Sequence, residues 1–75
     1  MKVRFKSKED RSEFMQRGPA NRMIATLIGM NWWLAENRLN DGTIELVTPQ
    51  KECIEIDGYY ALIFMNERKY FHIIV

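Results

Sequence analysis

The chain has 75 residues, 47% of them hydrophobic and 28% charged, a composition typical of one globular domain and not of a disordered tail. Eleven Lys and Arg against ten Asp and Glu leave a net charge of +1, so no overall field directs the protein to nucleic acid or to anionic lipid. Because Cys53 is the only cysteine and His72 the only histidine, neither a disulfide nor a cysteine-based zinc site can stabilise the fold. The domain must therefore fold on its own core or share a core with another copy.

The expected compartment follows from what the sequence lacks. No apolar run approaches the roughly 20 residues of a membrane span, and the first six residues have no apolar segment of the signal-peptide type. A lone cysteine suits a reducing environment. We expect a cytoplasmic protein.

Residues 1–6 alternate strictly between apolar and basic side chains, which predicts a half-buried strand. The basic set consists of Lys2, Arg4 and Lys6. In one interpretation this is an edge strand whose cations discourage pairing with other sheets. In the other, the three side chains form a stripe that contacts phosphates or an acidic partner.

Two helices are predicted next. Ser7 is a good N-cap with Asp10 in the position of a capping-box acid, so we expect a surface helix over residues 8–17, ended by Gly18 and Pro19. Pro19 also suits the first turn of a second helix over residues 19–28. Its apolar positions form an amphipathic stripe that can cover one face of a sheet: Ala20, Met23, Ile24, Leu27 and Ile28.

Residues 30–39 allow two interpretations. A helix would continue the apolar stripe through Met30 and Leu34. A strand is favoured by the break at Gly29, by the adjacent tryptophans and by a turn signal at Asp41-Gly42. That turn would pair Leu39 with Ile44 and Arg38 with Glu45 in a following strand over residues 43–48. We prefer the strand.

The last third of the chain, residues 52–75, contains three β-favouring runs and predicts an antiparallel meander. With Asp57-Gly58 as a two-residue turn, Ile56 faces Tyr59. This register also pairs Ile54 with Ala61 and Glu52 with Ile63. A loop over residues 66–69 would then pair Met65 with Tyr70, Ile63 with His72 and Ala61 with Ile74.

In this register neither face of the meander alternates with polar residues as a solvated face would, so both faces need cover. The predicted fold class is α+β, a two-layer domain over residues 1–75. It has an N-terminal strand, two short helices and an antiparallel sheet of about five strands that ends in the meander.

Catalytic chemistry finds little support in the sequence. Cys53 and His72 lie on opposite faces of the predicted meander, so we expect a buried structural cysteine and no thiol nucleophile. The scattered carboxylates match no metal-ligand spacing, and the four glycines form no phosphate loop. We expect no enzyme activity, no metal and no cofactor.

The tryptophan pair is the strongest functional feature. On a strand Trp32 and Trp33 point to opposite faces, so either both fill a small core or one remains as a binding anchor. We expect a small interaction protein of regulatory or antagonist type, of the kind encoded by bacteria and phages, which docks on another protein or on a second copy of itself. The candidate contact residues are Trp32, Trp33, Tyr60, Phe64 and Phe71. The alternative is single-stranded nucleic-acid binding through Lys2, Arg4 and Lys6 with aromatic stacking.

Overall fold

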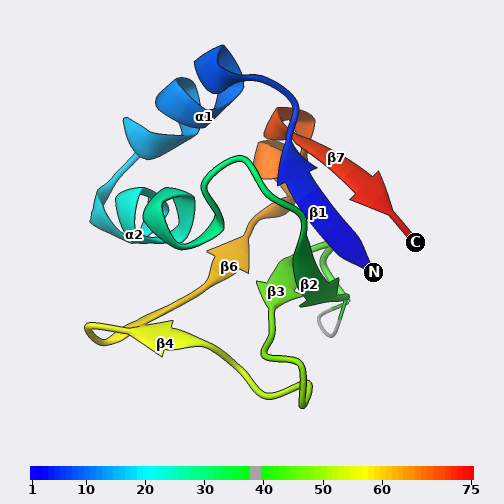
Figure 1. Ribbon diagram of the computed structural model, residues 1–75. Coiled ribbons are helices and arrows are strands. Elements are labelled where there is room, and N and C mark those ends of the chain that lie inside the picture. The colour runs from blue at the N-terminus through cyan, green and yellow to red at the C-terminus, as the bar shows by residue number, and fades with distance from the viewer. Residues whose placement is uncertain (38–39) are drawn as a thin grey trace.

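The computed structural model describes residues 1–37 and 40–75, and it confirms the α+β class. In these residues, three helices pack with one sheet of five antiparallel strands, in the order β6-β3-β2-β1-β7 (Figure 1). The elements are β1 (Lys2–Phe5), α1 (Lys8–Met15), α2 (Pro19–Ile28), β2 (Trp33–Glu36), β3 (Ile44–Leu46), β4 (Glu55–Ile56), β5 (Tyr59–Tyr60), β6 (Leu62–Ile63), the 3₁₀ helix η1 (Met65–Tyr70) and β7 (Phe71–Ile74). We call the side of the sheet toward the helices the inner face and the other side the outer face.

Helix α1 begins as predicted and ends earlier than predicted. The backbone N–H of Asp10 donates to Ser7 Oγ at 3.0 Å, and Ser7 Oγ donates to Asp10 Oδ2 at 2.8 Å. The helix ends at Met15, two residues before the expected end, and Gly18 is the N-cap of α2. The physical reason is Pro19, which disfavours a helical residue before it and keeps Gly18 extended.

Helix α2 has the predicted bounds, and Gly29 ends it with φ +60°. Ile24 and Ile28 are buried in the core. Arg11 joins the two helices, because its Nε and Nη2 both donate to the carbonyl of Ala25, at 3.2 and 3.1 Å. The Arg11 cation of α1, placed against the last turn of α2, also interacts favourably with the dipole of α2.

The core is built around aromatic side chains from opposite ends of the chain. Phe5 stacks on Phe71 with ring centroids 4.4 Å apart, and Phe14 of α1 meets both rings edge-on, at 5.4 and 5.3 Å. All three side chains are buried. Each such pair adds about 0.5–1.5 kcal/mol to the stability that area burial provides.

The position of β1 corrects the edge-strand interpretation. β1 lies inside the sheet between β2 and β7 and pairs with β7 from Lys2↔Ile74 to Phe5↔Phe71. The cause is β7, whose inner-face side chains match the apolar side of β1. The prediction of a cationic outer face is confirmed, since Lys2 and Arg4 alternate with the buried Val3 and Phe5.

The strand interpretation of residues 30–39 is confirmed over Trp33–Glu36, and the helix interpretation is wrong there. The predicted pairs of Arg38 and Leu39 lie outside the described residues. The described register differs from the predicted one, because Glu45 pairs with Glu36 and Leu46 with Ala35.

The C-terminal meander holds only for its first hairpin. Ile56 pairs with Tyr59 as predicted, and the N–H of Ala61 bonds to the carbonyl of Ile54 at 3.0 Å. The pairing of Glu52 with Ile63 is wrong, because Ile63 pairs with Ile44 of β3.

The second half of the meander is wrong as well. Residues 66–69 belong to η1, which carries the chain from one edge of the sheet to the other, so β7 pairs with β1 and not with β6. The three pairs predicted across that loop are therefore absent: Met65–Tyr70, Ile63–His72 and Ala61–Ile74. Because the helix changes which residues of β7 face inward, Phe71 joins the inner face, and His72 lies on the outer face.

The new register also changes the faces of the sheet. The inner face is apolar and covered by the helices, whereas the outer face mixes charged and apolar side chains. Its members are Lys2, Arg4, Leu34, Glu36, Glu45, Leu62, His72 and Ile74. The prediction of two apolar faces is therefore wrong for the outer one.

Candidate docking surface

Trp33 is held at the border between core and surface. It pairs with Val3 across β1 and β2, packs against the hydrophobic core and is half-buried. Its indole Nε1 donates to the carbonyl of Val47 at 3.2 Å. A buried indole needs such an acceptor, and this bond fixes the orientation of the ring.

Trp32 lies beside the outer face. The guanidinium carbon of Arg4 is 4.5 Å from the centroid of the Trp32 ring, a cation–π contact that contributes about 0.5–1 kcal/mol where it is solvent-exposed. The two side chains therefore have different surroundings: Trp33 of β2 packs against the core, and Trp32, just before β2, lies against Arg4 of β1.

The two tryptophans line a common apolar pocket of about 190 Å³, completed by Leu34, Val47 and Pro49. We call this the Trp pocket. The turn after β3 supplies its Pro49 wall, and that turn is closed by a bond from the N–H of Lys51 to the carbonyl of Thr48 at 2.8 Å. A second hollow of about 280 Å³ shares Leu34, Val47 and Pro49 and extends the surface to Met1, Ala35, Glu36 and Lys51. Together they form the candidate docking surface.

The other aromatic candidates do not join this surface. Tyr60 is 56% exposed on the separate β4–β5 hairpin, and Phe64 is 52% exposed just before η1. Phe71 is 3% exposed and stacks on Phe5, so its side chain belongs to the core and offers no surface for contact. The structure therefore brings together only the two tryptophans of the five candidates.

The basic stripe is partly assembled. Lys2 and Arg4 share the outer face with His72, which pairs directly with Arg4. Lys6 is exposed beyond the end of β1, where its N–H bonds to the carbonyl of Tyr70 at 2.9 Å. Cations and one indole thus lie next to each other at the border of the Trp pocket.

The thiol and the imidazole are far apart. Cys53 is bridged to Val47 beside β3, and His72 is on β7. Strand spacing puts the two positions on the order of 19 Å from each other, far beyond hydrogen-bond reach. Cys53 is also exposed, which corrects the expectation that it is buried.

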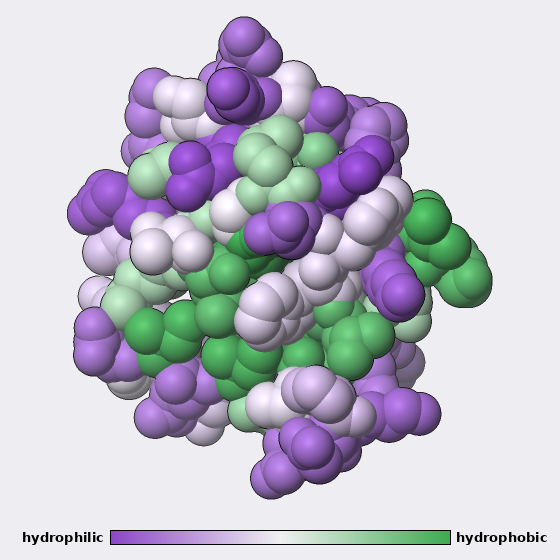
Figure 2. Space-filling model, viewed as in Figure 1, coloured by the Kyte–Doolittle hydropathy of each residue, from purple (hydrophilic) through white to green (hydrophobic). Residues whose placement is uncertain are grey.

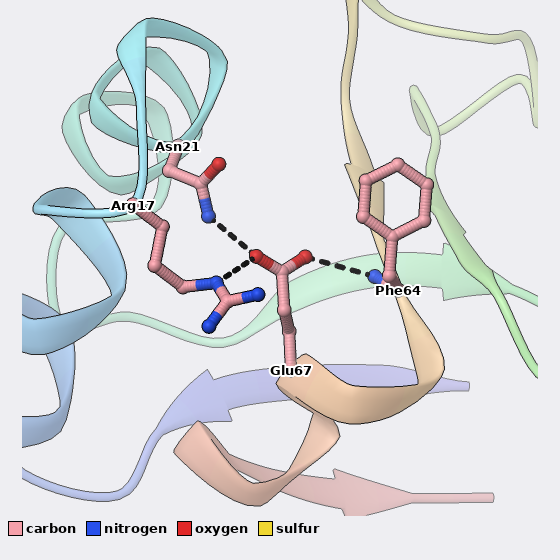
Figure 3. Close-up of polar contacts among 4 residues, drawn as sticks. All are labelled: Arg17, Asn21, Phe64 and Glu67. Atoms are coloured by element: carbon pink, nitrogen blue, oxygen red, sulfur yellow. Dashed lines mark hydrogen bonds and ion pairs between the residues drawn. The ribbon is translucent and has the colours of Figure 1, made fainter.

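A carboxylate buried between the helices was not found from the sequence. Glu67 of η1 has a side chain only 3% exposed. It accepts from Arg17 Nε at 2.8 Å, from Asn21 Nδ2 at 2.7 Å and from the backbone N–H of Phe64 at 3.0 Å (Figure 3). The hydrogen bond to Glu67 raises the pKa of Arg17 above its ordinary value. The residues of Asn66-Glu-Arg-Lys look like an exposed loop, so no local signal marks this contact.

A larger groove, between α2 and β4, was also not found from the sequence. It measures about 450 Å³ and is lined by Pro19, Arg22, Met23, Thr26, Leu27 and Ile56. Hydrophobic surface gathers there, between α2 and β4 (Figure 2). The apolar positions Met23 and Leu27 were visible as part of the α2 stripe, but their neighbour Ile56 comes from a hairpin that the sequence places in the main meander.

Comparisons with protein families, with curated proteins and with solved structures found no match to this chain. Across residues 1–37 and 40–75, no helix is both long enough and apolar enough to cross a membrane. In the same residues, no cluster of three or more metal-ligating side chains is present.

Proposed function

We propose that this protein is a small docking module of regulatory or antagonist type, and that it binds a partner protein through the Trp pocket. The observation that carries the proposal is the pocket itself, an apolar cavity formed by two adjacent tryptophans, Leu34, Val47 and Pro49. Buried aromatic anchors in water-excluding pockets dominate the energy of many protein interfaces.

The pocket walls are already in place before any partner arrives. Trp33 is oriented by its bond to Val47, and Trp32 is covered on one side by Arg4. A surface that is ordered beforehand loses little conformational entropy on binding, so more of the contact energy appears as affinity.

The chemistry around the pocket defines the partner. An apolar side chain of the partner enters the pocket, because its walls are apolar. Lys2 and Arg4 adjoin it on the outer face and favour an acidic residue next to that side chain. The sole cysteine is compatible with the cytoplasm as the compartment in which this binding takes place.

The test uses the protein as bait in a lysate of its native host, followed by titration of the captured partner as a purified protein. Trp32→Ala is expected to weaken binding at least about 10-fold, since anchor residues cost more than about 1.4 kcal/mol when truncated. Trp33→Ala is expected to weaken binding and also to lower stability, because Trp33 packs on the core.

Two exposed aromatics outside the pocket provide matched controls. Tyr60→Ala and Phe64→Ala remove side chains of similar size and are expected to leave the affinity unchanged. If these variants lose the partner while Trp32→Ala keeps it, the docking surface lies at Tyr60 or Phe64 and the proposal fails.

Single-stranded nucleic-acid binding is the second candidate. The observation in its favour is that Lys2, Arg4 and His72 share one face with Trp32, which combines cations with a stacking ring. It predicts retention on an oligonucleotide column that falls with salt and that weakens when Lys2, Arg4 and Lys6 are changed to Gln. Retention that does not respond to salt, or no retention, excludes this function.

A further inference from the structure

Strand β7 directs part of its backbone hydrogen-bonding groups away from the sheet. It is the last strand of the five-stranded order and lies at the margin of the sheet (Figure 1). The N–H of Lys6 donates to the carbonyl of Tyr70, which identifies these two residues as a hydrogen-bonded pair. Such pairs recur at every second residue, so His72 and Ile74 also direct their backbone groups to β1. In an antiparallel ladder the residues between them direct theirs the other way. The N–H and carbonyl of Ile73 and the carbonyl of Phe71 therefore point outward, whereas the N–H of Phe71 donates to the carbonyl of Arg68 at the end of η1.

This edge lacks the features that usually prevent strand pairing. Its residues include no Lys, Pro, Asp or Glu, and Ile74 is 54% exposed on the outer face. The opposite edge of the sheet, β6, is only two residues long. Of the two edges in the described part of the chain, β7 is the one suited to accept another strand.

We propose that β7 pairs antiparallel with β7 of a second copy, forming a two-fold symmetric dimer with one continuous sheet. With the axis at Ile73, Phe71 pairs with Val75 of the partner subunit, and Ile73 pairs with its own symmetry mate. This register sets His72 opposite the partner's Ile74, so the two imidazoles avoid each other.

A second copy of this chain is the partner that matches the β7 edge. Antiparallel pairing about a two-fold axis requires the same surface on both partners, and one strand supplies both halves. Residues 71–75 contain no acidic or basic side chain other than His72, so two copies bring no like charges together. The added inner-face contact at Ile73 extends the core, which is valuable for a 75-residue chain.

The dimer has a consequence that rests on the proposed function. The two-fold axis runs perpendicular to the sheet, so the outer faces of both copies point the same way. Each carries a Trp pocket near β1 and β2, and the dimer would present two pockets side by side. Such an arrangement raises the avidity for a partner that is itself repeated.

The test is the solution mass of the full chain, measured by sedimentation over a range of concentrations. The wild-type protein is expected to move toward twice 9.0 kDa as its concentration rises. Ile74→Lys places a charge on the pairing edge and is expected to remain at 9.0 kDa. Leu34→Lys, which places the same charge on the outer face of β2, is expected to dimerise like the wild type.

A second variant and a second measurement guard against a folding defect. Val75→Pro removes an outward N–H at an exposed position and leaves the ladder to β1 intact, so it is also expected to be monomeric. Amide hydrogen exchange at Ile73 should slow as the wild type dimerises. The amides of His72 and Ile74, which are bonded to β1, should be protected at every concentration.

The possible outcomes separate the two proposals. A wild type that stays at 9.0 kDa at all concentrations overturns the pairing, and so does a dimer that survives both edge variants. If Leu34→Lys alone lost the dimer, the interface would lie on the outer face and not at β7, and the pairing would be wrong. Monomeric Ile74→Lys that still binds the partner protein at one Trp pocket would leave the docking function intact.

Discussion

Two connections in the C-terminal third show what decides a turn in this protein. The Asp57-Gly58 turn joins β4 to β5 and has the backbone that its two residues favour, with φ of +48° and +82°. The connection over residues 64–70 forms η1, which crosses to the other edge of the sheet. The first is a local preference, and the second depends on Arg17 and Asn21, 50 and 46 residues away from Glu67.

A connection in this protein is thus specified by a buried polar contact as firmly as by turn residues. In the hairpin, Gly58 has open space around its Cβ position, so only its backbone matters. In η1, the carboxylate of Glu67 is satisfied by three donors from different segments, and moving it would leave buried polar groups without partners.

The largest expected effect concerns β7, the strand that follows η1 in the chain. Phe71→Ala should lower the free energy of unfolding by about 3–5 kcal/mol, because it opens a cavity beside Phe5 and Phe14. The control is His72→Ala, one residue away on the exposed outer face, which should change stability by less than about 0.5 kcal/mol. Chemical denaturation measures both. Equal losses of unfolding free energy would indicate that Phe71 does not face the core, and therefore that η1 does not set this register of β7.

The next effect tests the contact that holds η1. Glu67→Gln should cost about 1–3 kcal/mol of unfolding free energy, because the neutral amide brings one N–H donor against donors from Arg17, Asn21 or Phe64. Glu13→Gln, on the exposed side of α1, is the matched control and should be neutral within about 0.5 kcal/mol. Equal melting temperatures for Glu67→Gln and Glu13→Gln would contradict the role given to Glu67.

The smallest effect concerns the local turn. Gly58→Ala should cost about 1 kcal/mol, since φ is +82° and a Cβ is strained there without clashing with any neighbour. Gly58→Asn should cost less, because Asn adopts this region more readily. Chemical-shift changes should stay within β4 and β5. Changes that spread to β7 would show that the hairpin and η1 are coupled.

For the candidate docking surface, the sequence indicated two tryptophans that the structure brings together, and it did not indicate the arrangement of the pocket around them. The sequence predicted that the two tryptophans have different surroundings; Trp33 packs against the core, and Trp32, just before β2, contacts Arg4. The pocket between them required Pro49, which comes from a turn after the next strand. Phe71 looked equivalent to Phe64 in the sequence, yet one is in the core and the other on the surface.

Local patterns by themselves determined the α+β class, the capped start of α1, the bounds of α2 and the Asp-Gly hairpin. Each of these depends on neighbours within a few residues, through side-chain capping, helical spacing or the backbone freedom of glycine. The tertiary structure decided the order of strands, the place of β1 inside the sheet and the register of β7. These depend on which strands pair after the chain has crossed the sheet, and the contacts of Glu67 that guide this crossing come from residues distant in sequence.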